Sequence, residues 1–232
     1  METSCWRRAH PAWGQGARLG AALGLKLVGS FSMEGWAKVT LLGLDNLDSA
    51  GEDPSLSVAI LLYLSRKYQT APYWYPPDLQ ARARVDEYLA WQHTAIQLPA
   101  TNVYLCKSLL PHFSGQPVDT VRLDRLLGKL KPALQHLDQE VLAAKPFLAT
   151  EQVSLADLMA FTELMQPTAV GCDLFRDWPR LAAWRARVEA ALGPELVQDA
   201  HKLVLQPRDP RDAQQDPRLA QELVHRLQER LS

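Results

Sequence analysis

Ser57 and the apolar run after it are the part of this sequence best suited to binding an anion. Residues 58–64 are apolar without interruption, and the basic pair Arg66-Lys67 precedes Ala71-Pro72. A serine at the start and cations near the end favour a helix from about 57 to 69. The unpaired N–H groups and the dipole at such a helix start can bind a carboxylate. Ser57 is therefore either an N-cap alone or a contact to an anionic ligand.

Cysteine and histidine spacing argues against several other chemistries. The three cysteines, Cys5, Cys106 and Cys172, have no paired spacing, which predicts reduced thiols in the cytosol and neither a disulfide framework nor a zinc site. The six histidines lack the spacing of a helical metal site, so we expect no metal. A formal net charge of -1 gives no field that would attract nucleic acid, and the composition is that of a soluble, cytoplasmic protein without a membrane partner.

Two blocks follow directly after this first helix. The segment Tyr73-Trp-Tyr-Pro-Pro-Asp78 is a stiff aromatic linker, because each proline fixes its own backbone and pushes the preceding residue towards extended geometry. The segment 79–97 has an apolar flank that includes Val85 and Leu89 opposite solvated charges, which predicts an amphipathic helix. We expect Trp91 to extend the buried side of this helix.

A strong helix start is predicted at Ser154. Ser154 and Asp157 have the spacing of a capping box, and Val153 can pack on Leu158 as a hydrophobic staple. The apolar residues that follow recur at helical spacing, so this helix should lie deep in the core.

Two other regions carry helical periodicity. Residues 118–144 have it, but Gly128 and Pro132 interrupt it, and we expect Pro132 to kink or split the helix. Residues 207–232 indicate a charged linker followed by a terminal amphipathic helix.

These blocks, in this order, resemble the theta class of the glutathione S-transferases. The resemblance covers residues 55–205 and includes Tyr73-Trp-Tyr-Pro, the run from Asp78 to Thr94, Ser154-Leu-Ala-Asp-Leu158 and Pro179-Arg-Leu-Ala-Ala-Trp-Arg185. It implies a mainly α fold: the C-terminal helical bundle of the family, with an incomplete or absent thioredoxin-like α/β domain. The implied divisions are an atypical, poorly ordered segment 1–53, the last thioredoxin-domain helix at 54–72, a linker at 73–77, the helical domain at 78–206, and the tail at 207–232.

The resemblance also implies where ligands bind. In the family a Glu-Ser pair opens the first helix, and its serine with the backbone amides beside it holds the γ-glutamyl carboxylate of glutathione. Here the pair is Leu56-Ser57, so Leu56 can contribute only its backbone. The hydrophobic substrate site lies between the two domains, and its implied lining residues here are Trp91, His93, Thr94 and Gln97. Theta relatives often carry an arginine where Gln97 stands, so electrostatic help for anionic groups is weakened.

Residues 1–53 do not resemble the thioredoxin-like half of the family. Neither the serine that stabilises the glutathione thiolate nor the cis-proline motif is found there, so no catalytic residue is assigned. The implied function is conjugation of glutathione, as co-substrate, to hydrophobic electrophiles, with impaired activity in this chain. The alternatives are a non-catalytic helical interaction module, possibly a homodimer, or a remnant of the enzyme; the sequence does not separate these two.

Overall fold

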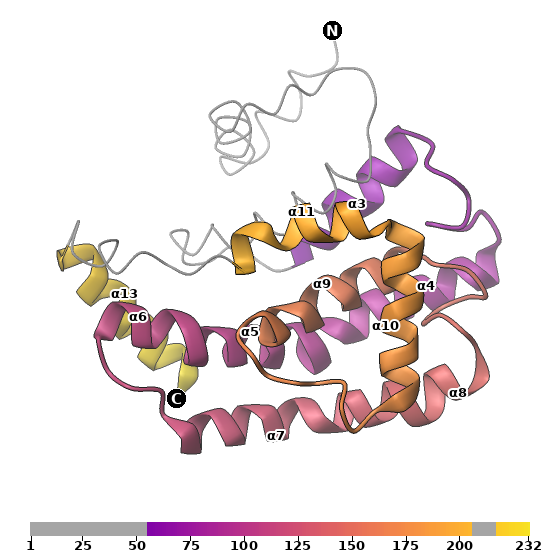
Figure 1. Cartoon of the computed structure of the whole chain (residues 1–232). Helices are drawn as coiled ribbons and strands as arrows, with labels where there is room; N and C mark the ends of the chain where they lie inside the picture. The colour runs from indigo at the N-terminus through magenta and orange to yellow at the C-terminus, as the bar shows by residue number, and fades with distance from the viewer. Residues whose placement is uncertain (1–54, 206–216) are drawn as a thin grey trace, which may run out of the picture.

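The computed structural model describes residues 55–205 and 217–232, and in this part of the chain it contains helices and loops but no strand (Figure 1). The predicted mainly α fold is confirmed there; expectations for residues 1–53 and for the linker at 207–216 lie outside the described residues. None of the described helices has the length and apolar character that a membrane crossing needs. In chain order the helices are α3 (Ser55–Lys67), α4 (Leu79–Gln92), η3 (His93–Gln97), α5 (Leu98–Tyr104), η4 (Leu105–Leu109), α6 (Leu110–Ser114), α7 (Thr120–His136), η5 (Leu137–Val141), α8 (Leu142–Ala144), α9 (Leu155–Ala169), α10 (Pro179–Leu192), α11 (Pro194–Leu205) and α13 (Pro217–Leu231).

One helical path runs without a break from α4 through η3, α5 and η4 to α6. The π-helical turns η3 and η4 end just before Pro99 and Pro111, which have no N–H to donate to the helix. At the end of η3 the Leu98 N–H donates to the carbonyl of His93, one residue further back than in an α-helix. The prolines thus widen the path locally, and the helix predicted to end at residue 97 continues to Ser114.

A second path joins α7, η5 and α8. Pro132 was predicted to kink or split this region. The prediction of a split is wrong, because α7 continues through Pro132. The pyrrolidine ring faces the carbonyl four residues back, which belongs to Gly128. Both residues are exposed, and a Cβ at position 128 would meet nothing within 4 Å. The carbonyl that loses its helical partner is therefore open to water, which limits the cost of the proline.

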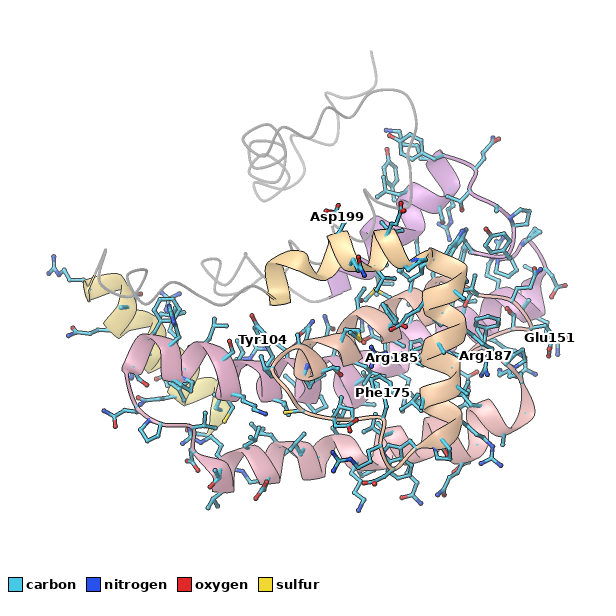
Figure 2. All side chains as sticks on the ribbon, viewed as in Figure 1. Tyr104, Glu151, Phe175, Arg185, Arg187 and Asp199 are labelled. Carbon is cyan, nitrogen blue, oxygen red and sulfur yellow. The ribbon has the colours of Figure 1, made fainter. Side chains whose placement is uncertain are left out.

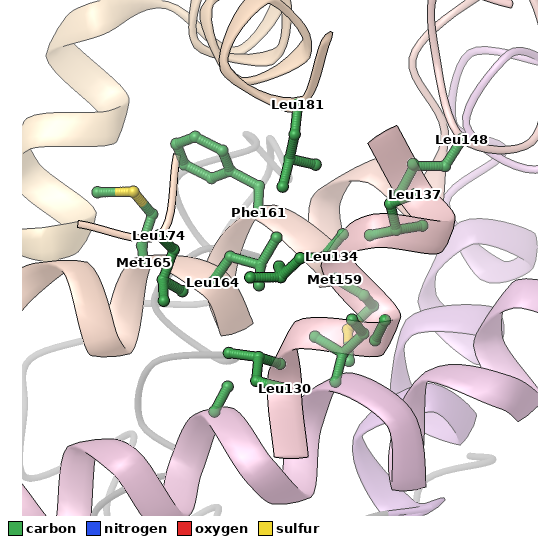
Figure 3. Close-up of a cluster of buried hydrophobic side chains, with 14 of the residues drawn as sticks. Leu130, Leu134, Leu137, Leu148, Met159, Phe161, Leu164, Met165, Leu174 and Leu181 are labelled. Atoms are coloured by element: carbon green, nitrogen blue, oxygen red, sulfur yellow. The ribbon is translucent and has the colours of Figure 1, made fainter. Parts of the chain in front are cut away.

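Helix α9 lies at the centre of the bundle, as predicted. Its capping box is formed by Ser154 and Asp157, and every residue from Leu155 to Met165 is buried. Figure 3 shows side chains of α9 meeting those of α7, η5 and α10. The labelled residues of this core are Leu130, Leu134, Leu137, Leu148, Met159, Phe161, Leu164, Met165, Leu174 and Leu181.

Helix α10 is held at its start by a residue far back in the chain. The buried carboxylate of Asp138, in η5, accepts hydrogen bonds from the backbone N–H groups of Arg180 (2.8 Å) and Leu181 (2.9 Å). An anionic oxygen at this position satisfies two unpaired donors and complements the helix dipole. On the same helix, the guanidinium of Arg185 lies over the ring of Phe175, 5.0 Å from its centroid, and both residues are labelled in Figure 2.

The linker between α3 and α4 is hydrogen-bonded to both of these helices and to the start of α9. The carbonyl of Trp74, which is buried, accepts from the Leu155 N–H at the start of α9 (2.9 Å). The hydroxyl of Tyr75 donates to the carboxylate of Asp86 on α4 (2.9 Å) and accepts from Arg66 on α3 (3.4 Å). These contacts place the end of α3 beside the α4 face that carries Asp86.

The terminal helix α13 packs against α6. Leu227 and Leu231 are each 2% exposed, and Arg125 of α7 donates to the carbonyl of Leu231 (3.2 Å). Arg230 donates to the side-chain oxygen of Asn102 (3.1 Å). The predicted terminal helix is thus present, and it is joined to the bundle by apolar burial and by polar contacts.

Candidate ligand-binding face

The start of α3 is the predicted anion site. The helix begins at Ser55, earlier than the predicted start near residue 57, so Ser57 lies inside the first turn. The side chains of Leu56 and Ser57 are outside the described set, and the backbone is helical at both positions. The first turn holds no acidic residue, and Arg66 and Lys67 occupy the last turn as predicted. The unpaired N–H groups of this first turn are the part of the helix able to bind a carboxylate.

Trp91 lies apart from the other predicted pocket residues. Its half-buried indole meets the ring of His136 edge-on, with centroids 5.5 Å apart, and lies 5.8 Å from the ring of Tyr88. These contacts direct Trp91 towards α7, where it adds to the packing between the two helical paths.

His93 and Gln97 are brought together by the turn η3. The His93 Nδ1 lies 2.7 Å from the Gln97 side-chain oxygen, and the Gln92 amide lies 3.3 Å from the same Nδ1. Thr94 is exposed, and no hydrogen bond joins its side chain to this group among the described residues. His93 and Gln97 thus form one hydrogen-bonded pair on the surface of η3, with Thr94 beside them.

A buried carboxyl group lies behind this pair. With its amide nitrogen turned towards α9, Gln92 donates to the Glu163 oxygens at 2.8 and 2.5 Å. Gln92 is 0% exposed and Glu163 is 3% exposed. Burial raises the pKa of Glu163 well above its ordinary value, because the low-polarity interior disfavours the carboxylate.

Tyr88 completes the buried polar group on α4. Its hydroxyl is buried and makes no hydrogen bond within the described structure. Burial and the nearby carboxyl groups of Glu163 and Asp157 raise the pKa of Tyr88 well above its ordinary value. The hydroxyl therefore stays protonated and adds no charge to the interior.

Sequence reasoning missed Tyr88, Gln92 and Glu163 as parts of one group. One signal was available: Glu163 is a charged residue inside an otherwise apolar helix that the capping box and periodicity place in the core. A buried acid of this kind requires a polar partner on the facing helix. The identity of that partner depends on how α4 and α9 cross, which the sequence does not show.

The placement of His93 follows from residues on the same helix. His93 opens η3 seven residues after Asp86 of α4, so the two residues lie on nearly the same side of this continuous helical path. Asp86 contacts Tyr75, which also contacts Arg66 at the end of α3. His93 therefore lies on the side of this path that carries the Tyr75 contact, about two turns further along. Leu98, close by in sequence, is 48% exposed and adds apolar surface at the start of α5.

No group of three or more metal-binding side chains occurs in the part of the chain that the structure describes. The chemistry available at η3 consists of an imidazole, an amide and a hydroxyl, and the start of α3 offers its own unpaired N–H groups. Such groups can bind and orient a ligand through hydrogen bonds.

Comparisons with known proteins agree with this architecture. The profile of the glutathione S-transferase C-terminal domain matches residues 104–191. Glutathione S-transferase theta-1 of Bos taurus is 50% identical over 171 residues, which cover 74% of this chain and 70% of the relative. Theta-1 of Homo sapiens is 50% identical over 168 residues, covering 72% and 69%.

Solved structures give the same result. The apo form of human glutathione-S-transferase T1-1 superposes with a TM-score of 0.68 at 46% identity, covering 76% of this chain and 73% of that one. A human theta-class transferase in complex with the glutathione conjugate of 1-menaphthyl sulfate gives a TM-score of 0.67 at 36% identity, covering 86% and 94%. The chain therefore belongs to the theta class of the glutathione S-transferase family.

Proposed function

We propose that this chain is a theta-class family member that keeps the helical ligand-binding face but conjugates glutathione to electrophiles little or not at all. Relatives in the family have been solved with glutathione and with a glutathione conjugate, which supports glutathione as the co-substrate of any remaining activity. The electrophile would be hydrophobic and would bind beside His93, Thr94 and Gln97. We place this activity in the cytoplasm and assign it no metal.

Leu56 is the observation that carries the proposal. At the start of α3 the residue before Ser57 is leucine, where the resemblance predicts glutamate. The backbone N–H groups of the first turn remain, but the carboxylate that would help to hold the cationic part of glutathione is lost. A charge-assisted hydrogen bond contributes about 1.5 to 3 kcal/mol, so its loss weakens binding roughly tenfold or more. The thiolate also needs stabilisation to react, and no residue of this chain has been assigned that role.

A homodimer or another protein contact is the second proposal, and the end of α3 supports it. Tyr63, Tyr68 and Tyr73 are 41%, 43% and 37% exposed. The ammonium of Lys67 lies over the rings of Tyr63 and Tyr68, at 5.4 and 5.5 Å from their centroids. Exposed tyrosines beside cations are typical of protein interfaces. This surface favours the interaction-module alternative if conjugation is absent.

The division of the chain at residues 73–77, between the helix α3 and the helical domain that follows it, stays a prediction.

Turnover measurements test the proposal. Glutathione and 1-menaphthyl sulfate are mixed with the full chain, and the human theta transferase solved with that conjugate serves as the positive control. We expect the rate with this chain to equal the uncatalysed rate. The variant Leu56→Glu should bind glutathione more tightly than the unchanged chain, whereas Ser57→Ala should not. Turnover by the unchanged chain close to that of the control would overturn the proposal.

A further inference from the structure

We propose that a hydrogen-bond chain from Glu163 to Gln97 holds neutral His93 with its hydrogen on Nδ1, so that the Nε2 lone pair accepts a hydrogen bond from a ligand. The ligand class is an apolar molecule that bears one O–H or N–H donor. For its ligand the inference rests on the binding face of the proposed function. The tautomer of His93 rests only on the contacts described above.

The first step is the contact between His93 and Gln97. The Nδ1 atom lies 2.7 Å from the Gln97 side-chain oxygen, a normal hydrogen-bond distance. A carbonyl oxygen can only accept, so the imidazole must be the donor. In a neutral imidazole only one nitrogen carries hydrogen, and the other then has a free lone pair. This contact therefore assigns the hydrogen to Nδ1 and the lone pair to Nε2.

The second step is the orientation of the Gln92 amide. An N–H of Gln92 directed at His93 would face the Nδ1 hydrogen, and two donors would oppose each other. With the amide turned, its oxygen lies 3.3 Å from Nδ1 and its nitrogen donates to Glu163 at 2.8 and 2.5 Å. An oxygen of Glu163 can accept this bond whether the carboxyl group is neutral or ionised. The Nδ1 hydrogen then faces the Gln97 oxygen and, at the longer distance, the Gln92 oxygen, while Gln92 donates to Glu163.

Burial stabilises this orientation of the Gln92 amide. Gln92 is 0% exposed and Glu163 is 3% exposed, so water does not replace a missing partner. An unsatisfied buried polar group is costly, so the amide orientation that gives the Gln92 nitrogen an acceptor on Glu163 is favoured. Glu163 and Gln92 act through His93 and are positioning residues; His93 is the group that contacts the ligand.

Nε2 lies on the other side of the imidazole from Nδ1. Nε2 makes no hydrogen bond to any residue that the structure describes, and His93 is half-buried. His93 lies on the same side of the helical path as Asp86, whose carboxylate is joined to the end of α3 through Tyr75. Thr94 and Leu98, which follow in the same stretch of chain, are exposed, and we expect the ligand to be mainly apolar with one donor.

Nitrogen NMR of the full chain labelled with ¹⁵N-histidine tests the tautomer directly. The spectrum is recorded at a pH where His93 is neutral, and its signals are assigned by their loss in His93→Gln. We expect Nδ1 to have the shift of a nitrogen that carries hydrogen and Nε2 that of a nitrogen with a lone pair. Hydrogen on Nε2, or averaging between the two forms, would overturn the inference.

Two variants at one position separate the hydrogen-bond chain from packing. Gln97→Glu keeps an acceptor oxygen and should leave the hydrogen on Nδ1. Gln97→Met has similar length without an acceptor and should shift the population towards hydrogen on Nε2. Circular dichroism checks that both variants keep the helical fold. An unchanged tautomer in folded Gln97→Met would contradict the role of Gln97.

A matched pair of probes tests the ligand class. We expect 1-naphthol, which has an O–H donor, to move the Nε2 resonance and to bind about fivefold or more tightly than 1-methoxynaphthalene, which has none. Equal binding of the two probes would overturn the acceptor role of Nε2. Binding of neither probe, with the hydrogen on Nδ1, would instead contradict the ligand-binding face of the proposed function and leave the tautomer in place.

Discussion

The indole nitrogen of Trp184 donates a 2.9 Å hydrogen bond to the carboxylate of Asp157, and this contact joins α10 to the start of α9. The same carboxylate accepts from the N–H of Leu148 (2.8 Å) and from the N–H and hydroxyl of Ser154 (2.9 Å each). Asp157 and Trp184 are both 0% exposed. The capping box of one helix is therefore also the point where a loop and a second helix are attached.

Loss of this contact should destabilise the protein. Trp184→Phe removes the indole donor and leaves Asp157 with three of its four hydrogen bonds. We expect the free energy of unfolding to fall by about 1.5 to 3 kcal/mol, the usual contribution of a hydrogen bond to a charged group. Urea unfolding followed by circular dichroism measures it. Trp178→Phe, at a half-buried indole, is the matched control. Equal losses in the two variants would contradict the special role of Trp184.

The buried Glu163 should make stability fall as pH rises. Its pKa in the folded state lies well above the ordinary value of 4.5, so the folded protein binds a proton that the unfolded chain has released. This contribution to stability is complete below about pH 4.5 and is lost as the pH rises through the folded-state pKa. Glu163→Gln keeps the shape of the side chain without a titratable group.

Urea unfolding at a series of pH values above 4.5 compares Glu163→Gln with the unchanged chain. We expect the difference in unfolding free energy to move in favour of the variant as the pH rises. Burial also raises the pKa of Asp157, which gives a fall of the same sign in both proteins and cancels in the comparison. A difference that does not change with pH would show that Glu163 is not a buried acid.

The two described cysteines should react slowly with alkylating reagents in the folded protein. Cys106 and Cys172 are 1% and 7% exposed, and burial raises the pKa of the Cys106 thiol. Because the thiolate is the reactive form, we expect Cys106 to be labelled by iodoacetamide only as fast as the protein opens. Peptide mass spectrometry follows each site separately. Labelling of Cys106 at the rate seen in urea would contradict its burial.

The docking of α13 should depend on its buried leucines. Leu227→Ala removes apolar contacts against the bundle and should cost about 2 to 5 kcal/mol at a fully buried site, enough to release the terminal helix locally. Hydrogen exchange should then speed up in α13 and α6. Gln228→Ala, at an exposed neighbouring position, is the control and should leave exchange unchanged. Equal exchange rates of α13 and α6 in Leu227→Ala and Gln228→Ala would show that α13 does not rely on this packing.

Local signals in the sequence predicted the elements well. The capping box at Ser154 gave the start of α9, and the apolar spacing after it gave the central position of that helix. Pro132 shows the limit of this reasoning. A proline was expected to kink or split its helix, but α7 continues, because the ring and the Gly128 carbonyl face solvent. Which side of a helix faces water is decided by packing between helices.

Long-range polar contacts could not be predicted. Asp138, 42 positions before Arg180, caps α10 from another helix. Gln92 meets Glu163 only because α4 and α9 cross at that level. Among the predicted pocket residues, His93 and Gln97 have the i, i+4 spacing that makes side chains neighbours on a helix, whereas the direction of Trp91 depends on α7. Side-chain partners across helices require the three-dimensional arrangement.

Calorimetric titration of the full chain with glutathione measures whether the chain still binds this co-substrate. Circular dichroism first establishes that the sample is helical, and the human theta transferase under the same conditions shows the heat expected from a binding-competent site. With Leu56 in place of glutamate, we expect no saturable heat up to millimolar glutathione. A saturating isotherm with a micromolar Kd would contradict this expectation.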